Sequence, residues 1–180
     1  MNEQTQHRLF FALWPDPGAR SQLLRLQDSL RSSVEARWVL PVNLHLTLTF
    51  IGQVTAERLQ DVREVAASAE AEPFSMWLNG LECWRSSRAL CLTPKQVPTA
   101  LNHLVETLAT GLDRAGFELD KRPYRPHLTL ARQTCCDQFG TEAAVEPLRF
   151  NVSAFHLVES SPAALGPVYE MMESWALGGD

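Results

Sequence analysis

Hydrophobic and polar residues follow one another along the chain in blocks that predict strands and helices in turn. Residues 8–16 (RLFFALWPD) form the first block, a mainly apolar stretch that predicts a buried strand ended by Pro15. A helix should follow, because Asp16 is a suitable N-cap and Pro17 suits the first helical position. The apolar stripe of this helix consists of Leu23, Leu24, Leu26 and Leu30.

The rest of the chain continues this order. Residues 38–52 (WVLPVNLHLTLTFIG) predict a strand that is interrupted at Pro41 and then alternates strictly between polar and apolar positions. Two further helices are expected at residues 55–70 and 98–115. Thr55 is the expected N-cap of the first, and Gly116 should end the second. The remaining strands are expected at residues 74–84, 88–94, 125–132, 147–160 and 166–177.

This order of elements predicts an α+β protein. We expect two pseudo-symmetric lobes, each an antiparallel sheet with flanking helices, around a central groove. The middle of the chain carries no Gly/Ser-rich or charged linker, so residues 1–180 are expected to form a single bilobal domain.

The tetrapeptide His-Leu-Thr-Leu occurs twice, starting at His45 and again at His127, and self-similarity explains this better than chance. Side chains of a strand alternate between its faces, so His45 and Thr47 should point to one side and the leucines to the other. His127 and Thr129 repeat this arrangement. Each motif therefore presents an imidazole and a hydroxyl about 7 Å apart.

Two imidazoles that face one substrate can divide acid and base work near neutral pH, because the pKa of an unperturbed histidine is about 6.5. A phosphodiester suits such a pair. One imidazole can deprotonate water, the other can protonate the leaving oxygen, and the threonines and nearby arginines can stabilise the phosphate charge without a metal or cofactor. Since the two motifs are identical, the residues do not show which histidine is the acid.

A formal net charge of −5 argues against a protein that coats nucleic acid through a broad basic surface. A local basic cluster nevertheless surrounds the second motif, and it favours recognition of a small anionic group or a nucleic-acid end. This cluster consists of Lys121, Arg122, Arg125 and Arg132.

The spacing of the cysteines and the length of the apolar runs indicate in which cellular compartment the protein is expected. The four cysteines include no Cys-x-x-Cys pair, so reduced thiols are expected. The apolar run at residues 9–14 is too short to span a membrane, and Pro15 and Asp16 follow it where a signal peptide would have small residues. We therefore expect a cytoplasmic protein without membrane contact, and a monomer.

With these motifs in place, the sequence closely resembles the two-histidine phosphoesterases. The stretches RLFFALW, NLHLTLTFIG and RPHLTLAR carry the resemblance, which covers essentially the whole chain. It is nearest to the RNA 2′,3′-cyclic phosphodiesterases, historically called 2′-5′ RNA ligases. The resemblance implies hydrolysis of a terminal 2′,3′-cyclic phosphate of RNA to a 2′-phosphomonoester. It also implies that His45 is the proton donor, that His127 is the proton acceptor, and that Thr47 and Thr129 hold the phosphate.

Several further residues are candidates for substrate contacts. Arg132 falls where relatives carry a substrate-facing arginine, although strict alternation would place it on the opposite face from Thr129 unless the strand ends or twists first. Arg125 lies beside His127. A terminal base could stack on an aromatic ring. The candidate rings are Phe10 or Phe11, Trp84 and Tyr124.

Plainer interpretations remain open. Threonine is a favoured strand residue whatever the function, and ordinary structural roles are expected for His7, His103 and His156. The tryptophans Trp14, Trp38 and Trp175 are expected in the core. Alternative functions are a phosphodiesterase for small cyclic nucleotides, a reversible 2′-5′ RNA ligase, or a binder of RNA ends without catalysis.

Overall fold

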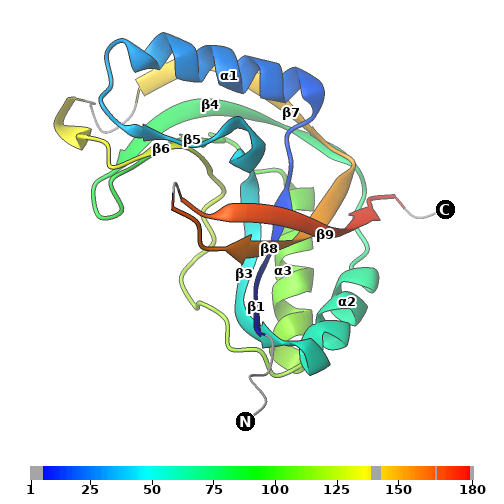
Figure 1. Ribbon diagram of the computed structural model, residues 1–180. Helices are drawn as coiled ribbons and strands as arrows, with labels where there is room; N and C mark the ends of the chain where they lie inside the picture. The colour runs from blue at the N-terminus through cyan, green and yellow to red at the C-terminus, as the bar shows by residue number, and fades with distance from the viewer. Residues whose placement is uncertain (1–5, 139–142, 165, 179–180) are drawn as a thin grey trace.

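The computed structural model describes residues 6–138, 143–164 and 166–178. Its helices are α1 (Pro17–Arg31), α2 (Leu59–Ala67) and α3 (Thr99–Arg114). Its strands are β1 (Gln6–Leu13), β2 (Arg37–Trp38), β3 (Leu46–Thr55), β4 (Phe74–Trp84), β5 (Ala89–Thr93), β6 (Leu128–Arg132), β7 (Ala143–Val152), β8 (Ala154–Ser161) and β9 (Val168–Ala176) (Figure 1). No helix in these ranges is long and apolar enough to cross a membrane.

All strand pairs are antiparallel, and the strand order is β7-β4-β5-β6-β3-β1-β8-β9, with β2 added beside β6. The two strands that follow the repeated histidines, β3 and β6, are neighbours at the centre and meet through the pair Leu46 and Leu128. We call this contact between β3 and β6 the seam of the sheet, and four strands of the order lie on each side of it. The predicted α+β class with antiparallel sheets and flanking helices is confirmed.

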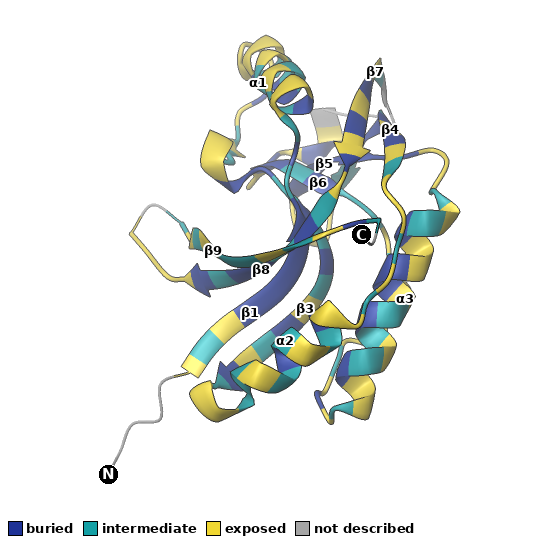
Figure 2. Cartoon of the chain, turned by 90° about the vertical axis from the view of Figure 1, so that its right-hand side faces the viewer, coloured by how far each residue is buried: buried dark blue, intermediate teal, exposed yellow. Residues whose placement is uncertain are grey.

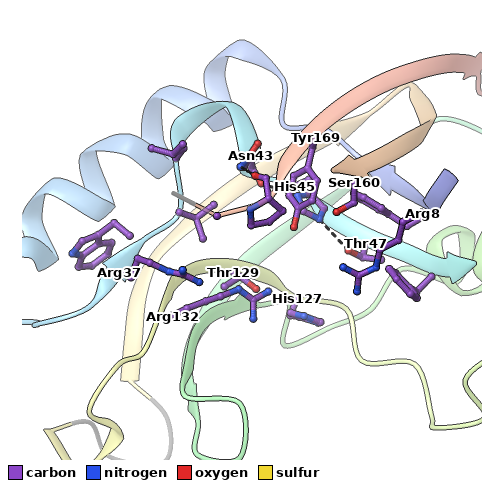
Figure 3. A pocket seen from close by; sticks show the side chains of 17 residues that line it. Arg8, Arg37, Asn43, His45, Thr47, His127, Thr129, Arg132, Ser160 and Tyr169 are labelled. Atoms are coloured by element: carbon purple, nitrogen blue, oxygen red, sulfur yellow. Dashed lines mark hydrogen bonds between the residues drawn. The ribbon is translucent and has the colours of Figure 1, made fainter. Parts of the chain in front are cut away.

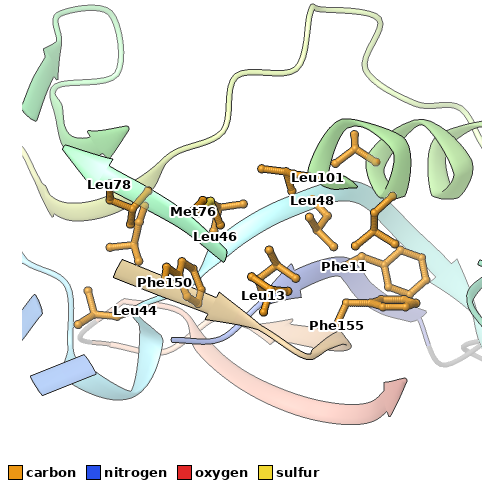
Figure 4. Packing of buried hydrophobic residues seen from close by; sticks show 14 of the residues in the cluster. Phe11, Leu13, Leu44, Leu46, Leu48, Met76, Leu78, Leu101, Phe150 and Phe155 are labelled. Atoms are coloured by element: carbon orange, nitrogen blue, oxygen red, sulfur yellow. The ribbon is translucent and has the colours of Figure 1, made fainter. Parts of the chain in front are cut away.

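The helices cover the two halves of the sheet separately. Helix α1 lies along β7 and the neighbouring β4, whereas α3 packs against β3 and carries α2 beside it (Figure 1). Buried residues follow the strands through both halves (Figure 2), and most of them form one large hydrophobic cluster, with a smaller one of Phe10, Ala12 and Val158 beside it. Leu46 and Leu48 of the first motif lie in the large cluster between Met76 on one side and Phe11 on the other (Figure 4). The leucines of the motif therefore anchor the seam in the core.

The helix ends follow the predicted signals in part. Asp16 accepts a hydrogen bond of 3.0 Å from the Ala19 amide, as expected of an N-cap, and Gly116 has φ +82° directly after α3. Thr55 makes no such side-chain bond. Thr55 does take the N-cap position of a short 3-10 turn over Ala56–Arg58 that comes before α2, but α2 ends at Ala67, so the predicted helix end at residue 70 is wrong.

The prediction of one strand over residues 147–160 is also wrong. The chain leaves β7 and enters β8 around Ser153, and the two strands pair in different halves, β7 with β4 and β8 with β1. Both strands are rich in strand-forming residues, and their partners are distant in sequence. The local pattern therefore did not reveal the crossover.

The expectation of four reduced thiols is wrong for two of them. Cys83 at the end of β4 and Cys136 after β6 form a disulfide, with their Cα atoms 5.4 Å apart. Of the other two cysteines, Cys91 is buried and Cys135 is exposed. The bonded pair is separated by 53 positions in sequence, so only the pairing of β4, β5 and β6 brings it together.

Candidate active site

The two repeated motifs face a common pocket at the seam of the sheet. His45 lies directly before β3 and His127 directly before β6, and each motif threonine lies inside its strand. All four side chains line the pocket (Figure 3). The grouping of His45, Thr47, His127 and Thr129 expected from the strand alternation is therefore present.

Both histidines are oriented in the same way. His45 Nδ1 lies 2.7 Å from the carbonyl oxygen of Asn43, and His127 Nδ1 lies 2.8 Å from that of Arg125. A carbonyl oxygen only accepts hydrogen bonds, so Nδ1 carries the proton in each ring and the neutral Nε2 keeps its lone pair. The Nε2 atom of His45 accepts a hydrogen bond of 3.1 Å from the Thr47 hydroxyl. Each motif thus keeps a basic Nε2 atom, which in the first motif lies next to the motif threonine.

His45 is enclosed by aromatic rings. Trp14 stacks on it with ring centroids 5.3 Å apart, and Phe10 and Tyr169 lie at 5.1 Å and 5.0 Å. Burial lowers the pKa of His45 from 6.5 to about 4, despite the hydrogen bond to Asn43, and the positive charge of Arg132 adds to this effect. His45 is therefore a neutral imidazole at pH 7.

His127 contacts a separate network of side chains that consists of Trp84, Glu82 and Arg125. The ring of Trp84 lies 4.3 Å from it, and the indole N–H of Trp84 donates a hydrogen bond of 2.8 Å to Glu82. Arg125 donates to the same carboxylate at 3.0 Å and lies over the Trp84 ring at 4.7 Å. Burial lowers the pKa of His127, and the positive charges of Arg132 and Arg125 add to this shift, whereas the hydrogen bond to the Arg125 carbonyl and the charge of Glu82 partly oppose it. Trp84 and Arg125 thus support the histidine without lining the pocket.

Arg132 lines the pocket together with Thr129, which strict alternation did not allow. The register explains this placement. Leu90 of β5 faces Ala131 and the next residue, Cys91, faces Thr129, so Leu130 is an extra residue in β6. Such a bulge reverses the alternation after it. Leu130 and Ala131 are both buried, and Arg132 returns to the face of Thr129.

Two of the aromatic candidates cannot offer a free ring face to a base. Phe11 is 0% exposed and packs in the core against Phe155, whereas its neighbour Phe10 lines the pocket. Tyr124 donates its hydroxyl hydrogen to the backbone carbonyl of Thr47 at 3.1 Å, and burial raises its pKa. Tyr124 therefore supports β3 behind the pocket.

The structure also adds pocket residues that the sequence did not suggest. They include Arg8, Arg37, Asn43, Phe50, Ser160 and Tyr169. Trp38, expected in the core, lines the pocket as well, and the partly exposed Trp14 contacts His45. No local signal could have identified most of them, because they come from strands and loops distant in sequence.

The other histidines have structural partners or lie elsewhere. His7 Nδ1 lies 2.9 Å from Glu159, and His156 Nδ1 lies 2.7 Å from the Ser174 hydroxyl. His103 is exposed on α3. In the part of the chain that the structure describes, no three His, Cys, Asp or Glu side chains are grouped so that they could hold a metal ion.

Comparisons with known proteins match most of the chain. Residues 14–163 match the 2′-5′ RNA ligase superfamily. The RNA 2′,3′-cyclic phosphodiesterase of Escherichia coli is 31% identical over 174 residues, covering 94% of this chain and 96% of the relative. The protein of the same name from Methanothermobacter thermautotrophicus is 30% identical over 182 residues, covering 94% and 98%.

Solved structures share the fold as well. The crystal structure of E. coli LigT complexed with 3′-AMP superposes with a TM-score of 0.86 at 29% identity, covering 97% of this chain and all of that one (100%). A crystal structure of a protein from Thermus thermophilus has a TM-score of 0.82 at 28% identity, covering 94% and 97%. The resemblance identified from the paired motifs is thereby confirmed, and the chain belongs to the 2′-5′ RNA ligase superfamily.

Proposed function

We propose that the protein hydrolyses the 2′,3′-cyclic phosphate at RNA 3′ ends to a 2′-phosphomonoester, by acid and base catalysis with His45 and His127. One observation carries the proposal. The two motifs place their imidazoles in the same orientation in one pocket, each with Nδ1 bonded to a backbone carbonyl and Nε2 left for chemistry. The relatives are named RNA 2′,3′-cyclic phosphodiesterases, which supports this reaction.

The reaction assigns one proton transfer to each histidine. Nε2 of His127 takes a proton from water as the water oxygen bonds to phosphorus. The bond between phosphorus and the 3′ oxygen breaks, and Nε2 of His45 donates a proton to that leaving oxygen. The hydroxyls of Thr47 and Thr129 and the guanidinium of Arg132 bind the non-bridging oxygens. The charge that develops is thus met by groups of this chain, with no metal or cofactor in the reaction.

The acid must acquire its proton together with the substrate. The surroundings of His45 in this chain keep it neutral at pH 7, because they lower its pKa to about 4. A bound phosphate brings a negative charge next to the ring and raises this pKa, because an opposite charge within about 4–6 Å favours the protonated form.

The two halves of the sheet act as one bilobal domain over residues 1–180 in this proposal, since each supplies one histidine and one threonine.

The first experiment measures turnover of a short RNA ending in a 2′,3′-cyclic phosphate, with EDTA present. We expect conversion to the 2′-phosphate, with a loss of about 10²- to 10⁴-fold in His45→Ala and in His127→Ala. His103→Ala is the matched control, because His103 is exposed on α3 and should turn over normally.

Each of the other outcomes favours a different function. Tight binding without turnover would make the protein a binder of RNA ends, and loss of turnover with EDTA would contradict the metal-independent route. Faster hydrolysis of cyclic mononucleotides would favour the small-nucleotide phosphodiesterase. Joining of 2′,3′-cyclic and 5′-hydroxyl ends would favour the ligase.

The direction of proton transfer is tested with a substrate that has sulfur in place of the 3′ oxygen. A thiolate leaves without protonation, so His45→Ala should recover much of its activity on this substrate, and His127→Ala should not. Recovery in His127→Ala alone would reverse the two roles.

A further inference from the structure

Two arginines face each other across neighbouring strands at one end of the pocket. Arg37 of β2 pairs directly with Arg132 of β6, and both are exposed and line the pocket. Their side chains lie on the same side of the motif residues, with Arg8 at the other end of the pocket (Figure 3). Like charges directly opposite each other in a sheet are destabilising. This pair therefore needs either a compensating acid or an anionic ligand.

No compensating acid is present in the part of the chain that the structure describes. Neither Arg37 nor Arg132 forms an ion pair with a carboxylate there, whereas many other arginines do. Those paired arginines are Arg31, Arg58, Arg63, Arg85, Arg122 and Arg125. The repulsion within the pair is thus left for a ligand to offset.

A buried side chain holds the pair together. Gln27 of α1 is 1% exposed, and its amide donates hydrogen bonds to the carbonyls of Val39 (3.0 Å) and Leu130 (2.9 Å). The Val39 amide donates to the same Leu130 carbonyl at 2.9 Å. Leu130 is the bulge residue that turns Arg132 into the pocket. A strand of two residues is thereby fixed beside β6, so the arginines cannot drift apart.

The positions of the two arginines suggest that each binds a different phosphate of the substrate. Arg132 lies on the same strand and face as Thr129, whose hydroxyl serves the cyclic phosphate in the proposed reaction. Arg37 lies one strand further out, about 5 Å across the sheet. The residues that follow it, Trp38, Val39 and Leu40, also line the pocket. A cyclic mononucleotide has nothing anionic to place there, whereas an RNA chain has a further phosphodiester.

We propose that Arg37 binds the phosphodiester that precedes the terminal nucleotide, while Arg132 stays with the cyclic phosphate, so that the site prefers an RNA chain to a cyclic mononucleotide. This inference rests on the proposed function, since it extends the same pocket along the substrate. It makes Arg37 a residue that determines the choice of substrate by length. Chemistry at the cyclic phosphate stays with the two motifs.

The test compares adenosine 2′,3′-cyclic monophosphate with the dinucleotide ApA carrying the same cyclic end. Wild type should show at least tenfold higher kcat/KM on the dinucleotide. Arg37→Gln should lower kcat/KM on the dinucleotide by about 10- to 100-fold, the range of a hydrogen bond to a charged group. The factor by which Arg37→Gln lowers kcat/KM on the mononucleotide should be at least fivefold smaller than on the dinucleotide. Arg25→Gln is the matched control, because Arg25 is exposed on α1 and does not line the pocket.

Two further readouts separate binding from structural damage. The slope of the logarithm of dinucleotide affinity against the logarithm of salt concentration should become shallower in Arg37→Gln, by the amount that corresponds to about one phosphate contact. Without ligand, the same variant should have a Tm equal to or above that of wild type, because one of two opposed like charges is gone.

Equal losses on both substrates, or no preference of wild type for the dinucleotide, would overturn the inference. If wild type hydrolyses neither substrate, the proposed function fails instead. Calorimetric binding of the 2′-phosphorylated mononucleotide and dinucleotide then decides the inference by itself. A loss of affinity in Arg37→Gln confined to the dinucleotide would support the subsite, and equal affinities would overturn it.

Discussion

At the scale of single residues, the repeated tetrapeptide produces a repeated geometry. In both copies the histidine precedes a strand, and its Nδ1 bonds the carbonyl two residues earlier. The surroundings of the two rings nevertheless differ. His45 is packed among aromatic rings, whereas His127 lies on Trp84, which a carboxylate holds in place. Identical motifs can therefore take different catalytic roles, because the neighbouring side chains distinguish them.

The lowered pKa of the half-buried His45 should make stability depend on pH. Its pKa is lowered from 6.5 to about 4 in the folded protein, so between these values the unfolded chain binds a proton that the native state does not. The free energy of unfolding that results from the neutral His45 is fully present above pH 6.5 and is lost as the pH falls toward 4. At about 1.4 kcal/mol per pKa unit, the loss amounts to roughly 3 kcal/mol.

Urea denaturation of wild type and His45→Gln at several pH values measures this contribution. The difference between the two free energies of unfolding should shrink by that amount from pH 7 to pH 4, because all other titrating groups are shared. A difference that stays constant with pH would show that His45 is not held neutral in the folded state.

At the scale of elements, helix α1 helps to shape the pocket although it contributes no group to it. The buried amide of Gln27 joins the segment after β2 to the bulge in β6. The bulge in turn places Arg132 beside Thr129. A residue on a helix thus determines which face of a strand an arginine occupies. Helical periodicity assigns such a position to the core and predicts an apolar side chain there.

Replacing Gln27 by leucine should destabilise the protein by about 1–3 kcal/mol, since the substitution leaves a buried carbonyl without its donor. The midpoint and slope of urea denaturation give this value directly. Gln22→Leu, at a partly exposed position of the same helix, is the control and should change stability by less than about 0.5 kcal/mol. Equal stability of the two variants would mean that the two hydrogen bonds of Gln27 contribute nothing net.

At the scale of the whole molecule, the site depends on both halves of the sheet. β3 and β6 meet at Leu46 and Leu128, and their leucines belong to one continuous core. The Cys83–Cys136 disulfide closes a loop that contains β5, α3 and β6, and Cys83 is adjacent to the Trp84 that supports His127. The disulfide therefore constrains the half that carries the second motif.

Removing this disulfide should lower stability by about 4 kcal/mol, the loop-closure value for a bridge across 53 positions. The double variant Cys83→Ser/Cys136→Ser avoids a leftover reactive partner, and its Tm should fall well below that of wild type under oxidising conditions. Cys135→Ser is the control, because Cys135 is exposed and not bonded. If a reductant leaves the Tm of wild type unchanged, the bridge makes no contribution to stability.

The sequence by itself determined the elements and the chemical groups. Periodicity located the three helices and most strands, and the repeated motif identified both histidines and both threonines. These features are local, because a side chain's direction in a strand and the end of a helix depend on a few neighbouring residues.

Only the tertiary structure decided how those groups are arranged and surrounded. The bulge at Leu130, the disulfide, the crossover from β7 to β8 and the facing of Arg37 and Arg132 all depend on the register between strands distant in sequence. The lowered pKa of His45 likewise depends on rings brought from β1 and β9 and on the residue just after β1. Register and burial are fixed by the packing of the whole chain, because a strand gains its partners and its low-dielectric surroundings only when the sheet is complete.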